Sequence, residues 1–196
     1  ARARATGVSI EPFAIEVNND GTRGYHSVLC VKASSPFQKI EDLKGKNLCL
    51  VDPNSTSGNN VPRFAMDKMG IDPDAFFGKL LYSGSHENAV TALLQGTCDA
   101  AFNWWNTEKE SNLLRMAARG AVKADSVRII MKSDLIPGSP TTLKRSLPEA
   151  MKADIKRAFL EAPVKGREAW LRISDGNATG YHEVKHEDYQ VIIDLN

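Results

Sequence analysis

Apolar and polar residues follow two different periods along the chain. Short apolar runs bounded by Gly, Pro, Asn or Asp predict β-strands, and apolar residues at the helical period predict α-helices. On these patterns we predict strands within residues 8–17, 25–32, 47–51, 79–82, 98–102 and 127–131. We predict helices at residues 63–69, 87–95, 112–118 and 148–162, and little regular structure after residue 162. Strand and helix alternate between residues 47 and 131, which favours an α/β fold with a largely parallel sheet.

The sequence begins in the middle of a structural pattern. Residues 1–7 lack an initiating Met and are typical of the end of a helix capped by Gly7, and a strand-like run follows at once. We therefore expect that an upstream part of the fold precedes residue 1. The missing signal peptide is then no argument for a cytoplasmic location.

Composition and charge exclude several classes of protein. The chain has 196 residues, 42% of them hydrophobic, and a formal net charge of +1, so a nucleic-acid-binding surface is disfavoured. No apolar run approaches the length of a membrane span. Cys30, Cys49 and Cys98 lie in apolar runs without CxxC spacing, which predicts buried thiols and supports neither a disulfide framework nor a zinc site.

Residues 51–62, VDPNSTSGNNVP, join a predicted strand to a predicted helix. The first turn of a helix has unpaired N–H groups and a positive dipole end, so Ser55, Thr56 and Ser57 could bind an anion there, and Gly58 permits close approach of the backbone. The stretch lacks the GK[ST] ending of a nucleotide-binding loop. Taken alone, its spacing fits a plain N-cap turn slightly better.

Residues 83–88, SGSHEN, repeat this arrangement after the next strand. His86 would begin the following helix, where its ring could donate a hydrogen bond to an anion, although a lone histidine is more often structural or solvated. Two such turns on successive strands of one sheet would converge on one crevice. Together they favour a site for a small anion.

Residues 103–108, NWWNTE, follow the strand predicted at residues 98–102. Trp104 and Trp105 could wall a pocket and exclude water, or pack in a core or interface. Glu108 could receive a cationic group of a ligand, or be a solvated charge. These alternatives stay open at this point.

The sequence shows no catalytic motif. It contains neither HExxH nor GxSxG, and none of its four histidines stands in a Cys–His signature. The residues taken alone therefore indicate no catalytic set.

Several motifs in one order resemble the phosphate, phosphite and phosphonate substrate-binding proteins of ABC importers, the PhnD family. They are GYHSV at residues 24–28, DLKGK at 42–46, DPNSTSG at 52–58, GSHE at 84–87 and IPG at 136–138. The resemblance runs from residue 1 to about residue 162. It implies a two-lobed type II periplasmic binding protein fold that closes on its ligand and lacks, in this chain, the N-terminal part of lobe one. Lobe one and the first hinge strand would take residues 1–30, lobe two 31–133, and the second hinge with the return to lobe one 134–196.

The resemblance also implies a ligand site. Hydroxyls of the first loop would hold the phosphorus oxygens, two further residues would donate to the same group, and one carboxylate would face the ligand's substituent: Ser55, Thr56, Ser57, then Tyr25 and His86, then Glu108. No metal or cofactor is implied.

Two departures from the family pattern concern the substituent. Ser139 stands after IPG, where relatives that take aminoalkyl phosphonates have an acidic residue, and this weakens the case for a cationic amine. Trp104 and Trp105 could shrink the pocket toward phosphite or a methyl-sized group, or stack on a larger one.

From the resemblance we expect a binding protein, not an enzyme, and a monomer that is periplasmic or lipid-anchored outside the cytoplasmic membrane. It would deliver a small phosphorus oxyanion to the permease subunits of an importer. The alternatives are a sensory domain of the same fold and an enzyme on this fold, as in thiamine-precursor synthesis.

Overall fold

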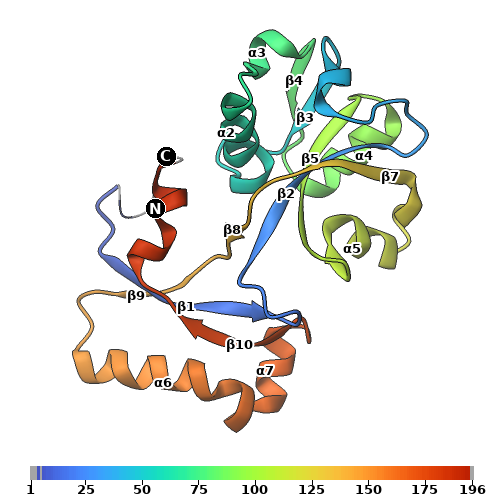
Figure 1. Ribbon diagram of the computed structural model, residues 1–196. Helices are drawn as coiled ribbons and strands as arrows, with labels where there is room; N and C mark the ends of the chain where they lie inside the picture. Colours follow the sequence, from blue (N-terminus) through green and yellow to red (C-terminus); the bar gives the residue numbers. More distant parts are fainter. Residues whose placement is uncertain (1–3, 5, 195–196) are drawn as a thin grey trace. The chain divides into compact units, whose positions relative to one another are not determined.

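The computed structural model describes residue 4 and residues 6–194, which form two compact units (Figure 1). Unit 1 comprises Ala1–Tyr25 and Pro137–Asn196, and unit 2 comprises His26–Ile136. The chain therefore passes between the units twice, after Tyr25 and after Ile136. The assignment of residues 1–30, 31–133 and 134–196 to lobes that close on a ligand stays a prediction. The helix end predicted at residues 1–7 lies largely outside the described residues.

Unit 1 is built on a three-stranded sheet with strand order β10-β1-β9. Its strands, all antiparallel, are β1 Ile10–Asn18, β9 Thr141–Lys144 and β10 Ala178–Glu183. Its helical elements are α6 Glu149–Lys165, α7 Arg167–Ile173, η4 His186–Tyr189 and α8 Gln190–Asp194. Phe159 of α6 and Trp170 of α7 pack against Tyr181 of β10. These long-range contacts order a segment in which the sequence pattern predicts little regular structure.

Unit 2 holds a seven-stranded sheet whose main path is β4-β3-β5-β2-β7. The strands are β2 Gly24–Lys32, β3 Asn47–Leu50, β4 Lys79–Tyr82, β5 Ala100–Thr107, β6 Glu110–Ser111, β7 Val127–Lys132 and β8 Ile136–Pro137. β3 runs parallel to β4 and β5, whereas β2 runs antiparallel to β5 and β7. Because β7 is antiparallel to β2, it points the same way as β3, β4 and β5. The prediction of a largely parallel sheet is therefore correct for the main path except at β2, the strand through which the chain enters the unit.

Helices cover both faces of this sheet (Figure 1). They are η1 Ile40–Leu43, η2 Thr56–Asn60, α2 Val61–Lys68, α3 Pro73–Phe76, α4 His86–Gln95, α5 Asn112–Ala118 and η3 Ala124–Ser126. On one face, Val90 and Leu93 of α4 pack with Met116 of α5. On the other face, Leu43 and Met66 pack against buried leucines of the sheet. Because both faces are buried, the central strands read as continuous apolar runs.

Two sequence expectations in unit 2 are wrong. The strand predicted at residues 98–102 is β5 Ala100–Thr107, so residues 103–107 lie within a strand and not after one. Cys49 and Cys98 form a disulfide across a sequence separation of 49 residues, and only Cys30, among the described residues, is a free cysteine. The N–H of Asp99 donates to the carbonyl of Asn47 at 2.8 Å. This hydrogen bond holds the turn before β5 against β3, so that Cys98 lies beside Cys49.

Candidate anion-binding site

The loops after β3 and β4 lie at one edge of the sheet in unit 2. β3 and β4 are parallel neighbours, so their carboxyl ends point the same way. The N–H of Gly84 donates to the carbonyl of Val51 at 2.8 Å, and the hydroxyl of Ser83 donates to the carbonyl of Leu50 at 3.0 Å. The structure thus brings together the two loops that the sequence singles out.

The loop after β3 enters a π-helical turn, η2, which continues into α2. Ser55 is the N-cap of this turn: its hydroxyl accepts the N–H of Gly58 at 3.0 Å. Ser55 is therefore an N-cap, as the plain interpretation of the sequence predicts. Capping uses the hydroxyl oxygen only as an acceptor, so its O–H can still donate a hydrogen bond. Of the hydrogen bonds between described residues, none uses the N–H of Thr56 or Ser57. Hydroxyl and amide donors therefore gather at the start of this helix.

Gly58 is required where it stands. A Cβ atom at this position would lie 2.4 Å from Cβ of Val51 and 2.8 Å from the hydroxyl oxygen of Ser55. The N–H of Val51 also donates to the Gly58 carbonyl at 3.0 Å. The loop is consequently folded tightly against the end of its own strand.

Asn59 braces the same loop from a buried position, 5% exposed. Its amide donates to the carbonyl of Pro53 at 3.1 Å, while its oxygen accepts the hydroxyl of Tyr82 at 3.1 Å and Nε of Arg63 at 3.2 Å. The sequence analysis does not single out Asn59. The one feature of the sequence that could have indicated this role is the position of Asn59, an amide residue between the capping serine and an apolar helix.

His86 is the first residue of α4, and Ser85 caps that helix by accepting the N–H of Asn88 at 3.1 Å. Nδ1 of His86 is buried and has no hydrogen-bond partner among the described residues. Burial lowers the pKa of His86 below its ordinary value, and the nearby Glu87 carboxylate opposes this in part. The ring is therefore neutral at neutral pH, with one nitrogen as a donor and the other as an acceptor.

Asn103 of β5 supports the start of α4. It is 3% exposed, and its amide donates to the backbone carbonyl of His86 at 3.0 Å. Its oxygen accepts the N–H of Trp104 at 3.0 Å. A buried Asn inside an apolar strand is the signal that could have identified this residue from sequence.

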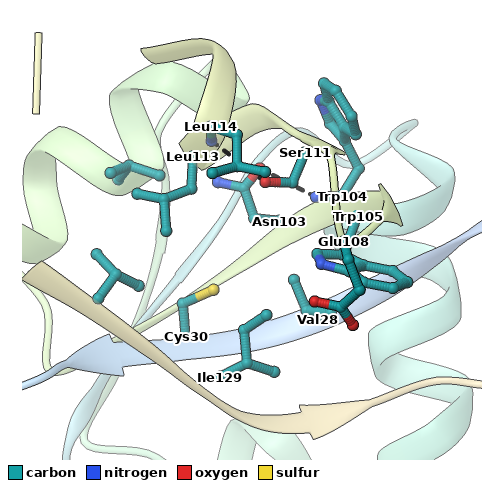
Figure 2. Close-up of a pocket in the computed structure, with 12 residues that line it drawn as sticks. Val28, Cys30, Asn103, Trp104, Trp105, Glu108, Ser111, Leu113, Leu114 and Ile129 are labelled. Atoms are coloured by element: carbon teal, nitrogen blue, oxygen red, sulfur yellow. Dashed lines mark hydrogen bonds between the residues drawn. The ribbon is translucent and has the colours of Figure 1, made fainter. Parts of the chain in front are cut away.

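Trp104, Trp105 and Glu108 line a cavity of about 160 Å³ in unit 2 (Figure 2). Its remaining lining comes mainly from apolar side chains of β2, β7, α4 and α5: Val28, Cys30, Val90, Asn103, Ser111, Leu113, Leu114, Val127 and Ile129. Neither the Ser55 loop nor His86 belongs to this lining, and Asn103 is the residue that touches both regions.

Basic side chains lie over both indoles of this cavity. The Arg115 guanidinium is 5.1 Å from the ring centroid of Trp104, and Nζ of Lys132 is 3.5 Å from that of Trp105. Both contacts are cation–π interactions. They place positive charge beside the indoles, opposite in sign to the exposed Glu108 carboxylate.

The predicted site residues divide between the units. Tyr25 and Ser139 belong to unit 1, and the others belong to unit 2. Their predicted convergence on one ligand stays a prediction. Across the described part of the chain, no helix is long and apolar enough to cross a membrane. The same residues contain no group of three or more His, Cys, Asp or Glu side chains placed to hold a metal ion.

The fold is that of the substrate-binding proteins of importers. A solved structure of a binding protein component of an ABC phosphonate transporter from Pseudomonas aeruginosa superposes with a TM-score of 0.80 at 27% identity, covering 100% of this chain and 64% of that chain. Residues 1–189 match the family model described as "ABC transporter, phosphonate, periplasmic substrate-binding protein". The chain therefore belongs to this family of transporter substrate-binding proteins, as the sequence motifs indicate.

Two relatives differ in what their names say they bind. The "Phosphonates-binding periplasmic protein" of Escherichia coli (strain K12) is 36% identical over 162 residues, covering 80% of this chain and 45% of that protein. The "Phosphate-import protein PhnD" of Mycolicibacterium smegmatis is 26% identical over 203 residues, covering 95% of this chain and 62% of that protein. The chain thus spans between about half and two thirds of the length of these relatives.

Proposed function

We propose that this protein is the periplasmic substrate-binding component of an ABC importer and that it binds a small phosphorus oxyanion. The observation that carries the proposal is the pair of helix N-termini at one edge of the sheet, where Ser55, Thr56, Ser57 and His86 lie. Unpaired N–H groups, hydroxyls and helix dipoles favour an anion in such a place. The names of the relatives, one for phosphonates and one for phosphate, support this ligand class.

The donors that would hold the anion are neutral. Hydroxyls of the loop and the N–H groups of Thr56 and Ser57 would bind the phosphorus oxygens, and the neutral His86 ring would donate one more hydrogen bond. The nearby Arg63 is already paired with Asp74 at 3.0 Å. The charge of the ligand would therefore be balanced mainly by helix dipoles and hydrogen bonds. Tyr25 would add a donor from unit 1 when the two units close.

The substituent of the ligand would face Trp104, Trp105, Glu108 and Ser139. The ammonium group of Lys132 over Trp105 and the absence of an acidic residue at position 139 count against a cationic amine, whereas the Arg115 charge is already paired with Glu110. An uncharged and small substituent, or none, fits these features better. We therefore expect phosphite, phosphate or methylphosphonate to bind more tightly than 2-aminoethylphosphonate.

In the periplasm, the loaded protein would act as a monomer and deliver the ligand to the permease subunits in the membrane. No chemical change of the ligand is part of this function, in accord with a family of binding proteins.

Calorimetric titration of the full-length protein with these four ligands tests the proposal. Ser55→Ala combined with Thr56→Ala should abolish binding while the protein stays folded, because it removes two hydroxyl donors. Asp72→Ala is the matched control: Asp72 caps α3, a helix that belongs to neither loop, by accepting the N–H of Asp74 at 3.1 Å. Unchanged affinity in the double variant would overturn the site, and no binding of any phosphorus oxyanion by the wild type would overturn the function.

A further inference from the structure

The carbonyl of Ser57 in the anion loop is bound by a residue from another element. The hydroxyl of Ser27, on β2, donates to the Ser57 carbonyl at 2.6 Å. Ser27 is 1% exposed and Ser57 is 3% exposed, so this hydrogen bond is shielded from water. A shielded hydrogen bond holds its partners in a fixed geometry more strongly than an exposed one.

This hydrogen bond fixes one peptide plane at both ends. In a trans peptide the carbonyl and the N–H point in opposite directions. In the peptide between Ser57 and Gly58, the carbonyl accepts a hydrogen bond from the Ser27 hydroxyl. The N–H of the same peptide donates to the hydroxyl oxygen of Ser55 at 3.0 Å. It cannot rotate without breaking both bonds. Its orientation also fixes which lone pair of Ser55 is occupied, and hence where the Ser55 O–H is free to point.

Ser27 is itself held beside the places where the chain leaves unit 2. Its N–H donates to the hydroxyl oxygen of Ser133 at 3.0 Å, and the N–H of Ser133 donates to the carbonyl of Ser27 at 2.8 Å. Nδ1 of the neighbouring His26 lies 2.8 Å from the Ser133 carbonyl. The chain crosses between units just before His26 and just after Ile136. A row of hydrogen bonds therefore connects both crossing segments to the anion loop.

We propose that Ser27 is a positioning residue for the anion loop, and that it makes the donor geometry of Ser55 and Ser57 depend on the two crossing segments. The inference rests on the proposed function for the identity of the ligand. Ser27 does not touch the anion. It acts through the peptide between Ser57 and Gly58.

The test compares Ser27→Ala with Ser35→Ala in the full-length protein. Ser35 is a matched control, because its hydroxyl donates to a backbone carbonyl, that of Lys32, at 2.7 Å, away from the loop. Calorimetry measures the Kd for methylphosphonate and for phosphate. Amide hydrogen exchange, which needs no ligand, measures the mobility of residues 55–60, and urea unfolding measures global stability.

For Ser27→Ala we expect Kd to rise about tenfold, the equivalent of one hydrogen bond. Hydrogen exchange should become faster at the N–H groups of Gly58 and Asn59, which donate to the hydroxyl and the carbonyl of Ser55 in the wild-type loop. The urea midpoint should fall further than for Ser35→Ala, because Ser27→Ala leaves a buried carbonyl unsatisfied, whereas the Lys32 carbonyl keeps the N–H of Ser35 at 2.9 Å. Both variants should remain folded in the absence of urea. Exchange at residues 55–60 as slow as in the wild type, or a Kd equal to the wild-type value, would overturn the role of Ser27.

The exchange result separates this inference from the proposed function. If the wild type binds no phosphorus oxyanion, the proposed function fails, and loop exchange still decides whether Ser27 positions the loop. If the wild type binds and Ser27→Ala leaves both Kd and loop exchange unchanged, the proposed function stands and the inference fails.

Discussion

Replacing Gly58 by Ala tests the tight folding of the anion loop against its strand. The added Cβ would lie 2.4 Å from Cβ and 2.5 Å from Cγ2 of Val51. Carbon atoms in contact are about 3.5–4.0 Å apart, so the loop and the strand must separate by about 1 Å. Gly58 cannot move alone, because its N–H is bonded to Ser55 and its carbonyl to the N–H of Val51, each at 3.0 Å.

A displacement of about 1 Å would stretch both hydrogen bonds beyond their useful range. Losing two of them lowers the free energy of unfolding by about 2 kcal/mol, at about 1 kcal/mol each. Residual overpacking against Val51 adds about 1–3 kcal/mol. We therefore expect Gly58→Ala to destabilise the protein by about 3–5 kcal/mol. The Kd for the anion should rise about 100-fold or more, because two charge-assisted hydrogen bonds at about 1.5 kcal/mol each would be misplaced.

Urea unfolding and calorimetric titration of the full-length protein measure these two quantities. Gly166→Ala serves as the control, since a Cβ there would meet nothing closer than the Ala162 carbonyl oxygen at 3.5 Å and φ is −121°. If Gly58→Ala unfolds at the same urea concentration as Gly166→Ala and binds the anion as the wild type does, the reasoning about this close approach is refuted.

Three further predictions concern the surroundings of the loops. Replacing both Cys49 and Cys98 by Ala should lower the free energy of unfolding by about 4 kcal/mol in urea titrations, as expected for a disulfide that spans 49 residues, and a loss below about 1 kcal/mol would contradict this. Burial lowers the pKa of His86 below 6.5, so the unfolded chain takes up more protons just below that pH and stability falls as the pH decreases there. His86→Gln should flatten this part of the plot of urea midpoint against pH, and an unchanged slope would show that other groups cause it. Asn103→Ala should destabilise the protein by about 1–3 kcal/mol, because the buried carbonyl of His86 and N–H of Trp104 lose their partner, and a change within about 0.5 kcal/mol would count against this bracing.

Local patterns were sufficient to predict the parallel part of the sheet in unit 2. β3, β4 and α4 have apolar runs or helical periods that their own residues define, and each lies within a residue or two of its predicted place. The second half of β5 was missed because its residues are polar or aromatic. His26 and Ser27 of β2 pair with Trp105 and Trp104, so contacts with the neighbouring strand extend β5 beyond its apolar segment.

Hydroxyl-rich loops could likewise be recognised from sequence, but the residues that brace them could not. The hydroxyl of Ser27 and the carbonyl of Ser57 are 30 residues apart in sequence, and Asn103 and His86 are 17 residues apart. No local period encodes such a contact. The disulfide was missed for the same reason, since only the pairing of β3 with the turn before β5 brings Cys49 beside Cys98.

The hydrogen bonds that hold the anion loop also determine how the proposed site responds to pH. The groups that hold the loop in place are hydroxyls, amides and backbone peptides, none of which titrates near neutral pH. Among the proposed donors of unit 2, only His86 changes its charge in that range, and its lowered pKa keeps it neutral until the solution is acidic. It follows that, above the pKa of His86, any pH dependence of binding reports the ionisation of the ligand. Affinity should then follow the fraction of the more highly charged anion, which accepts hydrogen bonds from every donor of the loops.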